Sequence, residues 1–166
     1  MKHLTENEMI SKLAAYCSLG ERCDFEVRKK LTAWGAPPDA AKRIIERLKS
    51  DNYLNEERYC RSFVSDKFRF NHWGKIKIGI ELHRKNIDTE AVNAALDLID
   101  GEEYEATLMQ LLKDRRRSVS GDTDADVFRK LCRFAAGRGF EAGLIVKCLK
   151  TLLKQNFNED DFPETA

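Results

Sequence analysis

Side chains that could catalyse a reaction or hold a metal form no pattern in this sequence. His3, His72 and His83 stand far apart, and none has a second metal-binding residue at the i,i+4 spacing of a helix-borne zinc site. The phosphate-binding pattern G-x-x-x-x-G-K-[ST], the nucleophile pattern G-x-S-x-G and the zinc pattern H-E-x-x-H are all absent. The sequence therefore predicts a protein that is not an enzyme and that needs no metal or other cofactor.

The five cysteines are an odd number and include no C-x-x-C pair. A disulfide framework is therefore not expected, and most of these residues are interpreted as small core residues in a reducing compartment. The first ten residues lack the apolar region of a secretory signal, and no apolar run approaches the roughly 20 residues of a membrane span. We expect a cytoplasmic protein with no membrane partner.

Basic residues provide the other candidate chemistry, because they recur in clusters along the chain. A single cluster is more often only the solvated face of a helix. Clusters that recur at matching places in successive repeats would instead align on one surface, which suits an acidic protein groove or a phosphate backbone. The predicted partner-binding residues, with one tryptophan among them, are Arg28, Lys29, Lys67, Arg69, Trp73, Lys75, Lys77, Arg84, Lys85, Arg115, Arg116, Arg129, Lys130 and Arg133.

Aromatic residues flank the basic edge in the middle of the chain. Tyr59, Phe63 and Phe70 recur at steps of four and seven residues, as one helical stripe requires, so the expected place of Phe70 is the core. Trp73 also suits core packing at a helix end. If it is exposed beside Lys75, it could instead anchor a protein partner or stack on a base.

Overall charge alone does not identify a partner. The 166 residues carry a net charge of +1, with 42% hydrophobic and 34% charged residues, as expected for a folded helical protein. The acidic segment 156–166 contains four acids and no base, so residues 1–155 carry +5. That balance is mildly basic. We expect the acidic segment to be disordered.

A repeat of about fifty residues organises the chain. Leu31, Leu82 and Leu131 are 51 and 49 residues apart, and each ends a basic helical stretch that is followed by a break and another apolar-striped helix. One repeat of three helices buries little core by itself, so neighbouring repeats should stack into an elongated, curved array. The prediction is an all-α protein with repeats at 1–51, 52–100 and 101–155.

Residues at helix ends define the expected elements. Asn55 is expected to cap a helix, Pro37-Pro38 to open one, and Asn86 to end one in the left-handed conformation. Thr89–Ile99 is predicted to be the last helix of the second repeat. Residues 75–80 alternate in the manner of a strand, but the apolar positions after them continue at helical spacing, so a helix is preferred.

The stretch Asp51–Ile87 resembles the RecX regulatory proteins of bacteria. The matching residues are Tyr53-Leu54-Asn55-Glu56-Glu57-Arg58-Tyr59, Phe63-Val64, Gly74, Ile78, Glu81-Leu82, Lys85 and Ile87. The family usually has Asp at position 55 or 56, Phe-Ala at Tyr59-Cys60, and Gly at Asn86. These departures are mild, because Asn caps helices as well as Asp does, Cys is small and apolar, and Asn tolerates the left-handed conformation.

The resemblance covers roughly residues 14–153. It implies three tandem three-helix repeats and a regulator that binds the filament of RecA on single-stranded DNA. Such a regulator curbs ATP hydrolysis, strand exchange and filament growth. A monomer is expected, and single- or double-stranded DNA is a further candidate partner, with weak sequence preference.

Two alternatives stay open at this stage. The first is a DNA-binding helical module that acts alone, for which Lys42, Arg43 and Arg47 could read bases from a third helix. Residues 89–99 offer only Asn93 for that purpose, which argues against three equivalent reading heads. The second alternative is a helical-repeat scaffold for another protein.

Overall fold

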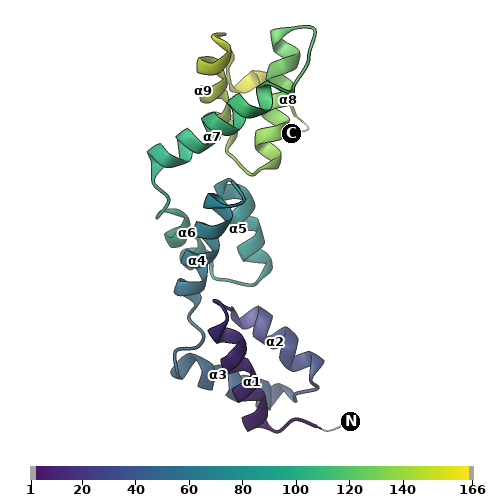
Figure 1. Ribbon diagram of the computed structural model, residues 1–166, viewed down its shortest axis with the longest axis vertical. Helices are drawn as coiled ribbons and strands as arrows, with labels where there is room; N and C mark the ends of the chain where they lie inside the picture. The colour runs from purple at the N-terminus through teal and green to yellow at the C-terminus, as the bar shows by residue number, and fades with distance from the viewer. Residues whose placement is uncertain (1–2, 165–166) are drawn as a thin grey trace. The chain divides into compact units, whose positions relative to one another are not determined.

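The structure, a computed structural model, describes residues 3–164, and all regular elements within them are helical. The predicted all-α class is therefore confirmed over the described residues. Figure 1 labels the helices, which are α1 (Glu6–Ser18), α2 (Asp24–Ala33), α3 (Pro38–Ser50), α4 (Glu56–Arg69), α5 (Lys75–Arg84), α6 (Thr89–Leu96), α7 (Gly101–Arg116), α8 (Asp124–Gly137), α9 (Ala142–Leu153) and the short 3-10 helix η1 (Glu159–Asp161).

Three of the predicted helix ends are confirmed. The side-chain oxygen of Asn55 accepts the backbone N–H of Arg58 at 2.9 Å, which caps α4. Pro38 is the first residue of α3, where the missing N–H costs nothing. Asn86 has a φ of 58° and follows α5, so it occupies the left-handed position that the sequence assigns to it.

Other boundaries differ from the expectation. Helix α6 ends at Leu96 rather than Ile99, because the chain turns there and Asp100 caps α7 through the N–H of Glu103. Helix α2 begins at Asp24, and its N-cap residue is Cys23. The Glu26 carboxylate accepts the Cys23 N–H at 3.2 Å, so an acid inside the first turn closes the cap.

The chain divides into two compact units. The first runs to Phe63 and includes Leu82–Ala95, and the second comprises Val64–Glu81 and the chain from Leu96 onward. Helices α4 and α5 each contribute residues to both units. Residues 64–81, which the sequence places in the second repeat, thus share a unit with the third, and the three repeat boundaries stay a prediction.

The first unit has its core where α1, α2 and α3 meet. Leu13, Val27 and Ile44 represent the three helices there, and all are fully buried. Leu54, in the segment before α4, closes the same cluster. The helices of this unit are thus held by one apolar stripe from each, as the 3.6-residue period requires.

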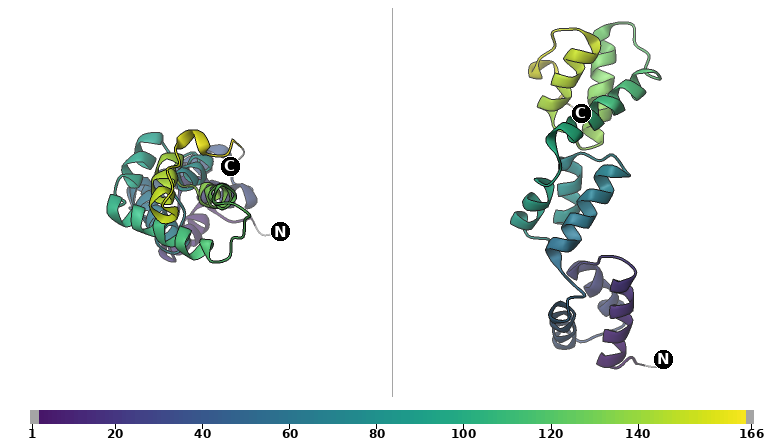
Figure 2. Two further views of the ribbon diagram at one scale, coloured as in Figure 1. Left: turned by 90° about the horizontal axis from the view of Figure 1, so that it is seen from above. Right: turned by 60° about the vertical axis from the view of Figure 1, so that its left-hand side comes forward.

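The second unit is built on α7, α8 and α9, which pack against one another pairwise and lie side by side in the views of Figures 1 and 2. Leu108 from α7, Leu131 from α8 and Ile145 from α9 are fully buried between them. Val64, Phe68 and Ile78 are also buried.

Two glycines allow the turn before α5 to contact the turn after α8. The N–H of Gly74 donates to the carbonyl of Arg138 at 2.7 Å, and the N–H of Ile76 donates to the carbonyl of Gly139 at 3.0 Å. A Cβ on Gly74 would lie 2.3 Å from the Gly139 carbonyl carbon, and Gly139 itself has a φ of +94°. Backbone therefore meets backbone here, with no room for a side chain.

The acidic segment is structured where disorder was expected. The Phe157 ring stacks on Phe128 with centroids 4.0 Å apart, and Asn158 caps η1 by accepting the N–H of Asp160. Burial of the Phe157 ring against α8 is favourable, and it offsets part of the conformational entropy that the acidic segment loses when it is ordered. The last two residues of the predicted disordered tail lie outside the described part of the chain.

Candidate partner-binding surfaces

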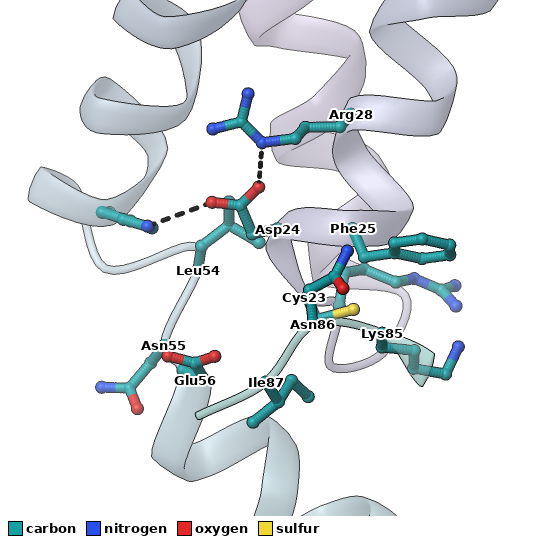
Figure 3. Close-up of a pocket in the computed structure, with 12 residues that line it drawn as sticks. Cys23, Asp24, Phe25, Arg28, Leu54, Asn55, Glu56, Lys85, Asn86 and Ile87 are labelled. Atoms are coloured by element: carbon teal, nitrogen blue, oxygen red, sulfur yellow. Dashed lines mark hydrogen bonds and ion pairs between the residues drawn. The ribbon is translucent and has the colours of Figure 1, made fainter. Parts of the chain in front are cut away.

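A pocket in the first unit lies at the starts of α2 and α4, and its volume is about 230 Å³. Figure 3 shows that the segment from Leu54 to Glu56 and the turn from Lys85 to Ile87 face it together with α2. Both segments belong to the stretch that carries the family resemblance. The lining residues are Arg22, Cys23, Asp24, Phe25, Arg28, Lys49, Leu54, Asn55, Glu56, Lys85, Asn86 and Ile87.

Three of the cations around this pocket are paired with acids of the same unit. Asp24 bonds to both Arg28 and Lys49, the latter at 3.2 Å, as the dashed lines of Figure 3 show. The ammonium of Lys85 lies 3.2 Å from the Glu26 carboxylate. The predicted site residues Arg28 and Lys85 are therefore brought to one pocket, but each already has an acidic partner.

Lys29 faces a second hollow, of about 480 Å³, which Phe25, Lys30 and Lys85 also line. The ammonium of Lys30 lies 4.4 Å from the centre of the Tyr16 ring, a cation–π distance. Arg84 is exposed at the end of α5. The four predicted residues of the first unit thus do not share one cavity.

Arg58 holds the segment before α4 rather than facing a partner. Its guanidinium bonds to the Glu21 carboxylate at 2.5 Å and to the carbonyls of Asn52 and Tyr53 at 3.0 and 3.4 Å. The ion pair with Glu21 thus gives Arg58 a structural role within the unit. In the same unit the Tyr59 hydroxyl donates to Glu26 at 3.3 Å, and burial raises the pKa of Tyr59.

Trp73 in the second unit is half-buried and covered by lysines. The ammonium groups of Lys67 and Lys77 lie 4.8 and 4.4 Å from the Trp73 ring, so both cations are committed to cation–π contacts. Lys75 lies 4.9 Å from the centre of the Tyr104 ring. The structure thus brings Trp73, Lys67 and Lys77 together, but as an internal packing cluster.

The prediction that Phe70 lies in the core is wrong, because this residue is 79% exposed. Helix α4 ends at Arg69, so the helical phase that predicts burial stops one residue earlier. The buried aromatic of this helix is Phe68. Ile76 and Ile80, one turn apart on α5, are also about half exposed, and sequence periodicity did not single out either residue as a surface position.

The third basic cluster forms a hollow of about 480 Å³ between the end of α7, the loop that follows and α8. Arg115, Lys130 and Arg133 line it together with Ser118, Val119, Ser120 and Phe134. Within the described chain no carboxylate is among these lining residues. The structure therefore brings three predicted site residues to one cationic surface, which is what an anionic partner group requires.

The remaining predicted residues of this cluster point elsewhere. Arg116 donates to the carbonyl of Leu152 at 3.1 Å, next to the end of α9. Arg129 pairs with Asp126 in the first turn of α8, and the Thr123 hydroxyl together with this cation lowers the pKa of Asp126. Outside this cluster, Arg69 is the last residue of α4 and its side chain is exposed.

The thiols fit a structural role. All five cysteines are free, and only Cys17 is not fully buried. Burial raises the pKa of Cys132 to about 12 and that of Cys148 to about 11, so both stay protonated at neutral pH. Among the described residues no cluster of His, Cys, Asp and Glu could hold a metal, and no helix is long and apolar enough to cross a membrane.

Comparison with known proteins identifies the family. The family model of the second three-helix domain of RecX matches residues 55–96, which cover α4, α5 and α6. The regulatory protein RecX of Xanthomonas axonopodis pv. citri (strain 306) is 32% identical over 120 residues, which are 72% of this chain and 72% of that protein. The chain belongs to the RecX family.

Further RecX proteins support this membership. The regulatory protein RecX of Clostridium perfringens (strain SM101 / Type A) is 29% identical over 141 residues, which cover 83% of this chain and 65% of that protein. The crystal structure of RecX from Lactobacillus salivarius has the same fold, with a TM-score of 0.81 at 21% identity, and covers 90% of this chain and 97% of that one. A second RecX crystal structure gives a TM-score of 0.77.

Proposed function

We propose that this chain is a non-catalytic regulator that binds the RecA filament on single-stranded DNA and inhibits its ATP hydrolysis, strand exchange and growth. Membership of the RecX family carries this proposal, because the relatives are regulatory proteins by name. The described residues support it in a second way. Their polar clusters are cationic surfaces and structural ion pairs rather than a nucleophile with a base.

The mechanism that we propose is occupancy of the filament by cationic surfaces. The hollow formed by Arg115, Lys130 and Arg133 supplies three exposed positive charges, and none of the described residues in its lining is a carboxylate. Such a surface pairs with carboxylates of the filament or with DNA phosphates. Cations that already have an acid in the same unit, such as Arg28 and Lys85, contribute less, because binding must first break an existing pair.

The test is ATP hydrolysis by RecA on single-stranded DNA while the protein is titrated in. We expect inhibition at less than one molecule per RecA protomer. We expect the triple variant R115E/K130E/R133E to lose most of this inhibition while keeping its helical circular dichroism. A reversal at Arg69, Lys75 and Lys77 is a second test, and it needs the same check of folding because Lys75 and Lys77, like Arg115, pack on aromatic rings.

The control is K42E/R43E/R47E, which makes the same change of charge on the exposed side of α3 but also breaks the pairs of Arg43 with Glu6 and of Arg47 with Asp51. Inhibition that survives the first triple variant but not the control would place the contact on α3. A wild-type protein that folds and leaves RecA hydrolysis unchanged would refute the proposed function.

A stand-alone DNA-binding module is the second candidate, and the absence of acids among the described residues that line the hollow at Arg115 favours it. It predicts binding to DNA without RecA, weakened steeply by added salt. Fluorescence anisotropy with a labelled single strand, with and without RecA, separates the two functions.

A further inference from the structure

The loop after α7 carries an unusual run, R-R-R-S-V-S, from Arg115 to Ser120. Both serines are exposed and follow the end of the helix at Arg116. Helix ends open locally at little cost, so an enzyme can reach this segment in an extended form. Arginines two and three residues before a serine match the pattern read by serine kinases that use acidic pockets to hold their substrates.

The folded loop returns both serines to the cationic hollow. Ser118 and Ser120 line it beside Arg115, Lys130 and Arg133. The hydroxyl of Ser118 donates to the carbonyl of Arg115 at 3.0 Å, and the ammonium of Lys130 donates to the carbonyl of Ser120. The Ser118 hydroxyl and the three cations thus already lie in one hollow in the unmodified protein.

The three cations are not neutralised by any acid among the described residues. Arg115 rests on the Phe134 ring at 5.1 Å, and within the described chain none of the three forms an ion pair. This distinguishes them from Arg129 and Arg28, which have acidic partners. A dianionic group in the hollow would therefore gain charge-assisted hydrogen bonds without displacing a carboxylate.

We propose that Ser118 is a phosphorylation site and that the hollow holds its phosphate. The serine oxygen attacks the γ-phosphorus of a nucleoside triphosphate bound to a kinase. The new O–P bond forms as the bond to the β-phosphate oxygen breaks, a nucleoside diphosphate leaves, and the hydroxyl proton passes to the kinase base. The modified Oγ no longer donates to the Arg115 carbonyl, and the phosphate turns toward Arg115, Lys130 and Arg133.

Phosphorylation would cancel the surface that the proposed function uses. A phosphoserine carries about −1.5 to −2 charges at neutral pH, which offsets most of the three positive charges. Regulation by this step rests on the proposed function, because it needs the hollow to contact RecA or DNA. Capture of the phosphate does not rest on it and is tested separately.

The first experiment uses the full chain, a serine kinase that prefers arginine before its target, ATP, and phosphorus NMR. We expect one phosphate, located at Ser118 by mass spectrometry and absent from S118A. In the folded protein its second pKa should fall on the order of one unit below the value of about 6 for free phosphoserine, and it should return to about 6 in urea.

Two variants assign the cause of that shift. K130A/R133A should restore most of the ordinary pKa of the phosphate, whereas R129A should leave the shift unchanged, because Arg129 pairs with Asp126 outside the hollow. The proposal is overturned if the kinase modifies Ser120 instead, if Ser118 takes no phosphate, or if its pKa is the same in folded and unfolded protein.

The last arm compares modified and unmodified protein in RecA ATP hydrolysis. At least a tenfold weaker inhibition after phosphorylation supports regulation through this hollow, and equal inhibition refutes it. If neither form inhibits RecA, the proposed function fails, whereas the NMR result still decides phosphate capture. A different outcome would assign the hollow to nucleic acid instead. In that case K130A/R133A would no longer bind a labelled single strand, and the phosphate on the wild-type protein would show no shift in its pKa on folding.

Discussion

Replacement of Gly74 by alanine should be among the most damaging small changes in the second unit. The added Cβ would lie 2.3 Å from the carbonyl carbon and oxygen of Gly139 and 2.4 Å from the backbone nitrogen of Phe140. These obstacles are backbone atoms, so no side-chain rotation relieves the clash. One of the two turns must move.

The cost follows from the hydrogen bonds between these turns. Separation breaks the bond from Gly74 N–H to the Arg138 carbonyl and the bond from Ile76 N–H to the Gly139 carbonyl. A buried backbone group without its partner costs about 1–3 kcal/mol. With two bonds lost and some water entering, we expect G74A to lower the free energy of unfolding by about 3 kcal/mol.

Urea unfolding followed by circular dichroism measures this loss. For a slope of about 2 kcal/mol per molar urea, the midpoint should fall by about 1.5 M. The control is G137A, because nothing lies within 4 Å of a Cβ at Gly137, the last residue of α8. Alanine there should leave stability unchanged or raise it slightly. Equal midpoints for G74A and wild type would refute the contact.

Three further outcomes are expected. N86A should lower stability by about 1 kcal/mol, measured by thermal unfolding, since Asn86 has a φ of 58°, while N86G should not. Above pH 9 the unfolded chain loses the Cys132 proton that the folded chain keeps to about pH 12, so the free energy of unfolding should fall with rising pH. This fall should be less steep in C132A, as measured by urea unfolding at several pH values. Parallel slopes for C132A and wild type would contradict the prediction. F157A should remove the stacking on Phe128 and speed proteolysis of the acidic segment, whereas F70A should not.

Local signals in the sequence were sufficient for the helices but not for their surroundings. Asn55, Pro38 and Asn86 act on their own neighbours, so their roles could be predicted without knowledge of the fold. Phe70 was misplaced because periodicity assumes a helix that in fact ends at Arg69. The contact of Gly74 with Gly139 joins residues 65 positions apart, and no local pattern reveals it.

The candidate site, too, could be predicted only in part from the sequence. Sequence clusters locate the cations, but which of them have partners depends on acids brought in by folding. Glu26 neutralises Lys85 from another helix, and aromatic rings take up Lys67 and Lys77. The hollow at Arg115, Lys130 and Arg133 forms because the loop after α7 lies beside α8, and residue spacing does not predict this arrangement.

The pairing of cations with acids within the protein determines how many cations can contribute to binding a polyanion. Small ions gather around a polyanion and are released when a protein cation takes their place, so the slope of affinity against salt reports the number of cations engaged. A cation already held by an acid, such as Arg28, Lys85 or Arg129, releases little on binding. On single-stranded DNA a slope of about two would correspond to the three cations of the one hollow, although the chain has 29 lysines and arginines.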